Sequence, residues 1–300
     1  MNRIGYTMLM LLSSSAALKL SAKWKKAELL QLLVNPGQGS TALEMLLMSS
    51  ENVATLCKAG SWQCEPCDFG RGLPLCKGID HDVNTLRIAA NTWAEYWDLS
   101  RPLLMKKSLL PQNVVEQHQM YLQMVTEGLP LRMQDASING LRFSYIAMWQ
   151  PLCLSPLNQG VKNLVRRLWD LSDLVEKLMQ ESGARVLVIN YASFVWDSEK
   201  TKKRVEEFLP EAGTLDTNFS PRRNIDIFDG NKWKPQQTIS QYASAHYDDA
   251  SSLGYNIEQQ RCESHDLSRI FAATQLSKAE ILTLQQKYQQ AVARLEALSH

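Results

Sequence analysis

The strongest constraint on the fold is a helix followed directly by a strand between residues 161 and 191. From Val161 to Met179 the apolar residues recur on one face of a helix, and Gly183 supplies a C-terminal stop. Residues 184–191 then form a nearly continuous apolar run, which is typical of a strand covered on both faces. This succession predicts an α/β fold with a mainly parallel central sheet flanked by helices.

The rest of the chain extends this alternation of helices and strands. Residues 141–149 and 102–105 are predicted as strands, and residues 213–269 as a polar, irregular region able to fold over a ligand. The last helix begins at Ser277, whose side chain is expected to form a capping box with Glu280. The other predicted helices span residues 40–49, 82–97, 112–126 and 198–209.

No internal repeat and no Gly/Ser linker divides the chain, which predicts one domain over residues 23–300. The 32 Lys and Arg residues balance 31 Asp and Glu residues, so the net charge does not favour a nucleic acid partner.

Residues 1–22 contain Arg3 and an apolar stretch that is shorter than the roughly 20 residues of a membrane-spanning helix. Two interpretations stay open. The segment is either a targeting signal for the secretory pathway, the Golgi lumen or an organelle, or an amphipathic helix packed on a cytoplasmic domain. Membrane association is expected only through this segment.

A strand, a tight loop and a helix are predicted between Leu32 and Leu47. The apolar run ends at Asn35, a Pro-Gly-Gln-Gly loop follows at residues 36–39, and helical spacing resumes at Ser40. Such a loop holds anions with backbone N–H groups and the helix dipole, so it predicts a phosphate-bearing ligand. Because no Lys follows Gly39, the loop lacks the GxxxxGK[ST] pattern, which disfavours an ATPase, a GTPase or a nucleotide or sugar kinase.

Four of the six cysteines gather in one short stretch, and two of these form a CxxC pair. Their spacing leaves three interpretations open: a four-thiolate zinc site, two disulfides, or unlinked thiols. The four residues are Cys57, Cys64, Cys67 and Cys76.

Several motifs taken together resemble the sulfotransferase family. Pro36–Leu47, of the type Pro-x-x-Gly-Ser-Thr-Ala-Leu-Glu-x-Leu-Leu, is similar to the family's 5′-phosphosulfate loop. Residues 188–209 look like the late element in which Tyr-Glu-Asp-Leu precedes a helix ending in Phe-Leu. Met105–Ser108 falls where carbohydrate-directed members carry Glu-Lys-Ser-Pro, and residues 148–158 fall where the family places its 3′-phosphate Arg and Ser.

This resemblance implies a three-layer P-loop-like fold that binds 3′-phosphoadenosine 5′-phosphosulfate as donor substrate. The implied reaction moves the sulfonate group to a hydroxyl of a small-molecule or glycan acceptor and requires no metal. As in phosphoryl transfer, catalysis would come mainly from positioning and from groups that stabilise charge on the leaving phosphate.

The resemblance also assigns the site residues. Lys107 and Lys106 are the candidate catalytic cations. The loop residues would hold the 5′-phosphate, and two polar residues after the 141–149 strand would face the 3′-phosphate. The candidate donor-binding residues are Gly37, Gln38, Gly39, Ser40, Thr41, Ser108, Gln150 and Asn158.

Three departures from the family pattern support an alternative. Gly37 stands where the loop usually carries a cation, Lys106 replaces the Glu that would act as general base, and Gln150 replaces an Arg. The alternative is a catalytically weakened or inactive homologue that serves as a nucleotide-binding or interaction module. Four histidines are available as bases in place of the missing Glu, namely His81, His118, His246 and His265.

Overall fold

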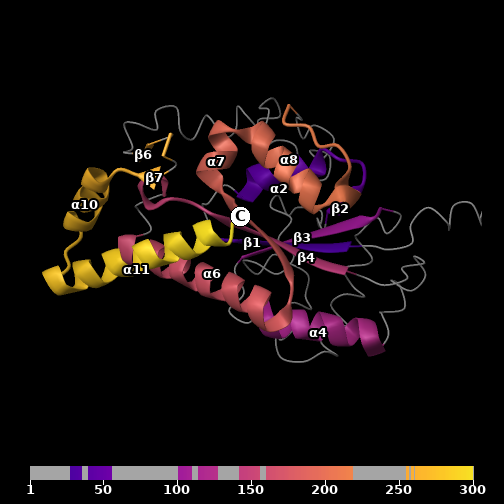
Figure 1. Ribbon diagram of the computed structural model, residues 1–300, viewed down its shortest axis with the longest axis horizontal. Coiled ribbons are helices and arrows are strands. Elements are labelled where there is room, and N and C mark those ends of the chain that lie inside the picture. The colour runs from indigo at the N-terminus through magenta and orange to yellow at the C-terminus, as the bar shows by residue number, and fades with distance from the viewer. Residues whose placement is uncertain are drawn as a thin grey trace, which may run out of the picture.

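The computed structural model describes residues 28–35, 40–55, 101–109, 114–127, 142–155, 160–218, 255–256, 258–259 and 261–299. Five strands form one sheet in the order β2-β3-β1-β4-β5, and each neighbouring pair is parallel (Figure 1). The strands are β1 (Glu28–Val34), β2 (Val53–Thr55), β3 (Leu103–Leu109), β4 (Arg142–Trp149) and β5 (Arg185–Asn190). The predicted α/β class and the parallel central sheet are therefore confirmed.

Helices of the described residues cover both faces of this sheet. One layer contains α2 (Ser40–Met48), α7 (Tyr191–Trp196) and α8 (Ser198–Phe208). The opposite layer contains α4 (Val114–Glu127), α6 (Val161–Ser182) and α11 (Lys278–Ala297), with α10 (Ser264–Ala272) beside it (Figure 1). Two short 3₁₀ helices, η2 (Leu152–Leu154) and η4 (Pro210–Ala212), and a two-stranded antiparallel hairpin of β6 (Tyr255–Asn256) and β7 (Arg261–Cys262) complete the described elements.

The alternation of side chains along β1 explains the three layers. Leu29 and Leu33 pack with the α4–α6–α11 layer, whereas Leu30, Leu32 and Val34 pack with the α2–α7–α8 layer. Because successive side chains of a strand point to opposite faces, a run of apolar residues in β1 supplies both cores at once.

The strand order reverses between β1 and β4. From β1 the chain runs through α2 on one face to β2, and from β4 it runs through α6 on the other face to β5, on the opposite side of the sheet. In open α/β sheets, a crevice for ligands forms outside the carboxyl ends of the strands at such a switch point. The carboxyl ends of β1 and β4 are thus the place where a ligand site is expected.

Two predicted helix ends are confirmed by their caps. Gly183 ends α6 in the left-handed conformation, with φ of 63°. Ser277 and Glu280 form both hydrogen bonds of the capping box that begins α11.

The predicted irregular region of residues 213–269 is wrong in part, because its described residues include β6, β7 and most of α10. Strand β5 ends at Asn190, before the predicted Tyr191. The Asn190 side chain accepts a hydrogen bond from the backbone N–H of Ala192 and so begins α7.

Some predictions fall on residues outside the described parts of the chain. They include the segment 1–22, the helix 82–97 and the four clustered cysteines. The single domain over residues 23–300 stays a prediction. Within the described ranges, no helix combines the length and the apolar character needed to cross a membrane.

Candidate functional site

The predicted phosphate loop begins and ends at the switch point. Asn35 directly follows β1 and is buried, and its Nδ2 donates a hydrogen bond to the carbonyl oxygen of Arg167 on α6 at 3.3 Å. Half-buried Ser40 is the first residue of α2, and Thr41 is the second. Gly37, Gln38 and Gly39 lie between them, outside the described residues.

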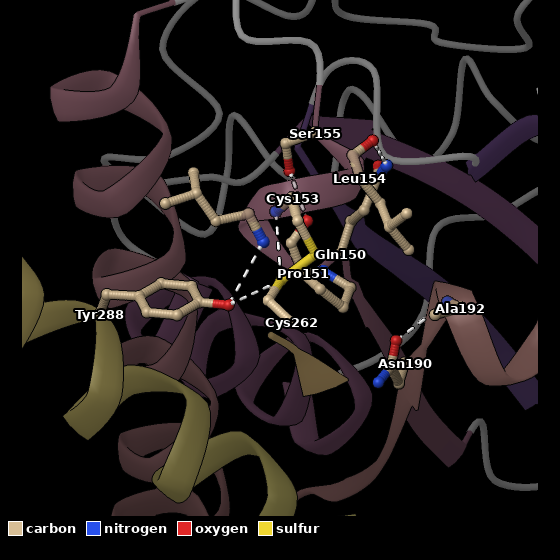
Figure 2. Close-up of a disulfide and its surroundings, with 10 residues drawn as sticks. Gln150, Pro151, Cys153, Leu154, Ser155, Asn190, Ala192, Cys262 and Tyr288 are labelled. Carbon is tan, nitrogen blue, oxygen red and sulfur yellow. Dashed lines mark hydrogen bonds between the residues drawn. A yellow bond between two sulfur atoms is a disulfide. The ribbon is translucent and has the colours of Figure 1, made fainter. Parts of the chain in front are cut away.

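Gln150 lies at the same edge, because it directly follows β4. Its side chain is 1 % exposed, and its Nε2 donates a hydrogen bond to the carbonyl oxygen of Leu154. This bond turns the amide N–H group toward the η2 turn of its own chain (Figure 2). Asn158, the second residue predicted for the 3′-phosphate, lies outside the described residues.

The three predicted residues of β3 lie at different heights in the sheet. Lys106 pairs with Gln31 at the middle of β1, and its side chain is 2 % exposed. Lys107 and Ser108 follow it toward the carboxyl end, where Ser108 pairs with Leu33. Ser108 and Gln150 therefore lie toward the carboxyl ends of the strands, whereas Lys106 lies at the middle of the sheet.

A row of buried polar side chains crosses the sheet beneath α4. Gln31 pairs with Lys106 on one side and with Tyr145 on the other. The Tyr145 hydroxyl lies 2.8 Å from Nδ1 of His118 on α4, and burial raises the pKa of Tyr145 and lowers that of His118. The side-chain amide of Gln31 has no hydrogen-bond partner among the described residues. Sequence reasoning singled out Lys106 and His118 but missed the row, because only the register of the sheet brings Gln31, Lys106 and Tyr145 side by side.

The buried His118 predicts a stability that depends on pH. Burial lowers the pKa of His118 in the folded state, so the unfolded chain binds the proton first as the pH falls. The stabilisation is complete above the unfolded pKa of about 6.5 and is lost below it, toward the folded pKa. We expect His118→Gln to reduce the loss of unfolding free energy between about pH 7.5 and pH 5.

Urea denaturation at the two pH values measures this effect, with His265→Gln as the control because His265 is exposed on α10. Equal losses in the wild type and in His118→Gln would contradict the prediction.

A cavity of about 440 Å³ opens beside this edge, at the carboxyl ends of β4 and β5. Trp149 and Asn190 end these two strands, α8 forms a second wall, and the turn between β6 and β7 and the end of α11 form the outer wall. The size is within the range of sites for small molecules. The lining residues are Trp149, Asn190, Ser193, Asp197, Lys200, Thr201, Arg204, Glu258, Gln259, Glu296 and Ser299.

A disulfide between Cys153 and Cys262 joins the segment after β4 to the β6–β7 hairpin (Figure 2). Both cysteines are buried, and the Tyr288 hydroxyl of α11 lies 3.6 Å from Sγ of Cys262. The same hydroxyl accepts a hydrogen bond from the backbone N–H of Leu152, and burial raises the pKa of Tyr288 to about 12. The pairing was not predicted, because 109 residues separate the two cysteines and spacing alone does not bring them together.

The fold and the site define an α/β protein with a parallel sheet and a candidate ligand site at the carboxyl edge of that sheet. No protein-family model matches the chain, and a search of curated proteins finds no match.

Proposed function

We propose that the chain binds 3′-phosphoadenosine 5′-phosphosulfate at the carboxyl edge between β1 and β4 and transfers its sulfonate group to a hydroxyl acceptor. The observation that carries the proposal is that the central strand β1 ends at the switch point of the sheet, and that only five residues, including the sequence 36–39, separate it from the start of α2. A glycine-containing loop at this place, followed by a helix N-terminus, suits an anion such as a phosphate.

The P-loop-like character of the fold is part of this proposal. The order β2-β3-β1-β4-β5 puts the strand before the loop at the centre of a parallel sheet, with β3 and β4 on its two sides. The end of β1, where the loop starts, is thereby flanked by the ends of β3, which carries Ser108, and of β4, which Gln150 directly follows. These are the strands on which the family resemblance places further donor-binding residues.

In the proposed reaction, an acceptor hydroxyl oxygen attacks the sulfur, and the bond between sulfur and the phosphate oxygen breaks. The hydroxyl proton passes to a base, and 3′-phosphoadenosine 5′-phosphate leaves. The α2 N-terminus and the hydroxyls of Ser40 and Thr41 would hold the 5′-phosphate, and Lys107 would stabilise its developing charge.

The alternative, a homologue that binds the nucleotide without transferring sulfonate, is favoured by two observations. Gln150 donates its amide N–H to its own chain, so it offers the 3′-phosphate less than an Arg would. Lys106 is buried at mid-strand, away from the carboxyl ends of the strands where the donor would bind, so it is poorly placed to exchange a proton with the acceptor.

Titration calorimetry with 3′-phosphoadenosine 5′-phosphate tests the proposal. We expect binding that is weakened at least tenfold when the 3′-phosphate is absent, and a further loss of about tenfold in Ser40→Ala. Ser264→Ala is the matched control, since Ser264 is an exposed first residue of a different helix, α10. No binding at millimolar nucleotide would refute both the enzyme and its inactive alternative.

A transfer assay with labelled donor then separates these two alternatives. Transfer by the wild type and a loss in Lys107→Ala would support the enzyme, whereas binding without transfer to any hydroxyl acceptor would support the inactive homologue. Unchanged transfer in Lys107→Ala would remove Lys107 from the proposed mechanism.

The disulfide indicates in which cellular compartment the protein folds. Disulfides persist in oxidising environments, so the Cys153–Cys262 bond favours the interpretation of residues 1–22 as a signal for the secretory pathway over a cytoplasmic location.

A further inference from the structure

The cavity beside β4 and β5 is lined mainly by polar side chains. Apart from Trp149, its lining side chains are polar, with hydroxyl, amide, carboxylate and cationic groups all present. Hydroxyls and amides both donate and accept hydrogen bonds, carboxylates accept them, and Lys donates them. A ligand with several hydroxyl groups can satisfy all of these, because each of its hydroxyls also donates and accepts.

The charges on the walls disfavour an anionic ligand. Lys200 and Arg204 face three carboxylates, those of Asp197, Glu258 and Glu296. The Arg204 guanidinium also donates to protein carbonyl oxygens, at 3.3 Å to Val188 and 2.6 Å to Ser299. Because three carboxylates stand against two cations, and part of the Arg204 donors is already used, a phosphate or a carboxylate would meet more negative than positive charge in the cavity.

Trp149, the last residue of β4, closes the cavity on the side of the sheet. The Trp149 side chain is 1 % exposed and ends the strand that also leads to Gln150. Its Nε1 has no hydrogen-bond partner among the described residues. The indole is therefore packed in the core beneath the cavity and offers a ligand little surface of its own, so the polar side chains decide what binds.

The outer wall is held by contacts that span the sequence. The disulfide anchors β7 to the segment after β4, and the ring of Tyr255 on β6 stacks on Trp196 of α7 with 5.2 Å between the ring centroids. Within the turn, the backbone N–H of Gln259 donates to Oδ1 of Asn256 at 2.8 Å. These contacts fix Glu258 and Gln259 opposite the ends of β4 and β5.

We infer that this cavity binds a neutral, multiply hydroxylated molecule such as a saccharide, and that the Cys153–Cys262 disulfide positions its outer wall. The binding does not depend on the donor nucleotide. The interpretation of the bound molecule as the sulfonate acceptor rests on the proposed function, because it places an acceptor hydroxyl beside the edge that would hold the donor.

Saturation-transfer NMR with glucose, galactose, N-acetylglucosamine and lactose, recorded without nucleotide, tests the inference. We expect at least one of these saccharides to bind, and Glu258→Gln and Lys200→Gln each to weaken its binding about tenfold. The matched controls are Glu181→Gln and Lys203→Gln, which remove the same charges from exposed positions outside the cavity. If none of the four saccharides binds, or if all four variants bind equally, the inference is wrong.

A second measurement separates this site from the donor site. We expect the double variant Cys153→Ser, Cys262→Ser to lose saccharide binding at least tenfold while its affinity for 3′-phosphoadenosine 5′-phosphate changes less than threefold. If Lys200→Gln or Glu258→Gln instead weakens nucleotide binding, the cavity belongs to the donor and the inference fails. If the wild type binds a saccharide but does not bind 3′-phosphoadenosine 5′-phosphate, the proposed function is refuted, and the inference about the cavity stands by itself.

Discussion

Replacing Glu28 with alanine is expected to lower the free energy of unfolding by about 3 kcal/mol. The Glu28 side chain is 0 % exposed at the amino end of the central strand. Its Oε1 lies 3.1 Å from Nη1 of Arg185 and accepts a hydrogen bond from Ser144, and its Oε2 lies 3.3 Å from Nη2 of Arg142. One carboxylate thus joins β1, β4 and β5 at the edge opposite the candidate site.

The magnitude follows from what the substitution leaves behind. Breaking a buried ion pair typically costs about 3–5 kcal/mol, because the remaining charge loses its partner without regaining water. Arg142 keeps its ion pair with Glu211, and the side chains of Arg142 and Arg185 are 40 % and 41 % exposed, so the charges left behind are compensated in part and the lower end of the range applies.

Urea denaturation at neutral pH measures this loss. Glu181→Ala is the control, since Glu181 is exposed on α6 and its removal should change the free energy of unfolding by less than about 0.5 kcal/mol. A loss below about 1 kcal/mol for Glu28→Ala would show that the network contributes little, contrary to the prediction.

Removal of the Cys153–Cys262 disulfide is expected to lower the free energy of unfolding by about 4 kcal/mol. The bond closes a loop with a sequence separation of 109 residues. In the chain-entropy model, a loop of about 100 residues contributes about 4.7 kcal/mol by restricting the unfolded chain. The estimate is reduced slightly because real unfolded chains keep some structure.

The double variant Cys153→Ala, Cys262→Ala measures this effect by urea denaturation against the wild type. The variant Cys153→Ser, Cys262→Ser serves as comparison, since any larger loss there reports the two buried hydroxyls, not the lost crosslink. A loss below about 1 kcal/mol in the alanine variant would contradict the prediction.

Local patterns predicted the elements of the fold well. The apolar face from Val161 to Met179 and the stop at Gly183 predicted α6, and the capping box at Ser277 predicted the start of α11. These signals are carried by neighbouring residues, because helix periodicity, helix caps and strand composition depend on contacts within a few positions.

The short helix α7 and the small hairpin of β6 and β7 were not predicted. Helix α7 has only six residues, and each hairpin strand has two, so neither gives a periodic pattern long enough to recognise. The hairpin is held by the disulfide and by the stack of Tyr255 on Trp196, both of which are contacts distant in sequence.

By itself the sequence determined the α/β class, the parallel character of the sheet and the position of a glycine-containing loop after an apolar strand. Only the tertiary structure decided the strand order, which puts the end of β1 at the switch point, and the different depths of Lys106 and Ser108 in the sheet. It also decided the cavity and the disulfide. The physical reason is that element type follows from local spacing, whereas a site is made where chain segments far apart in sequence pack together.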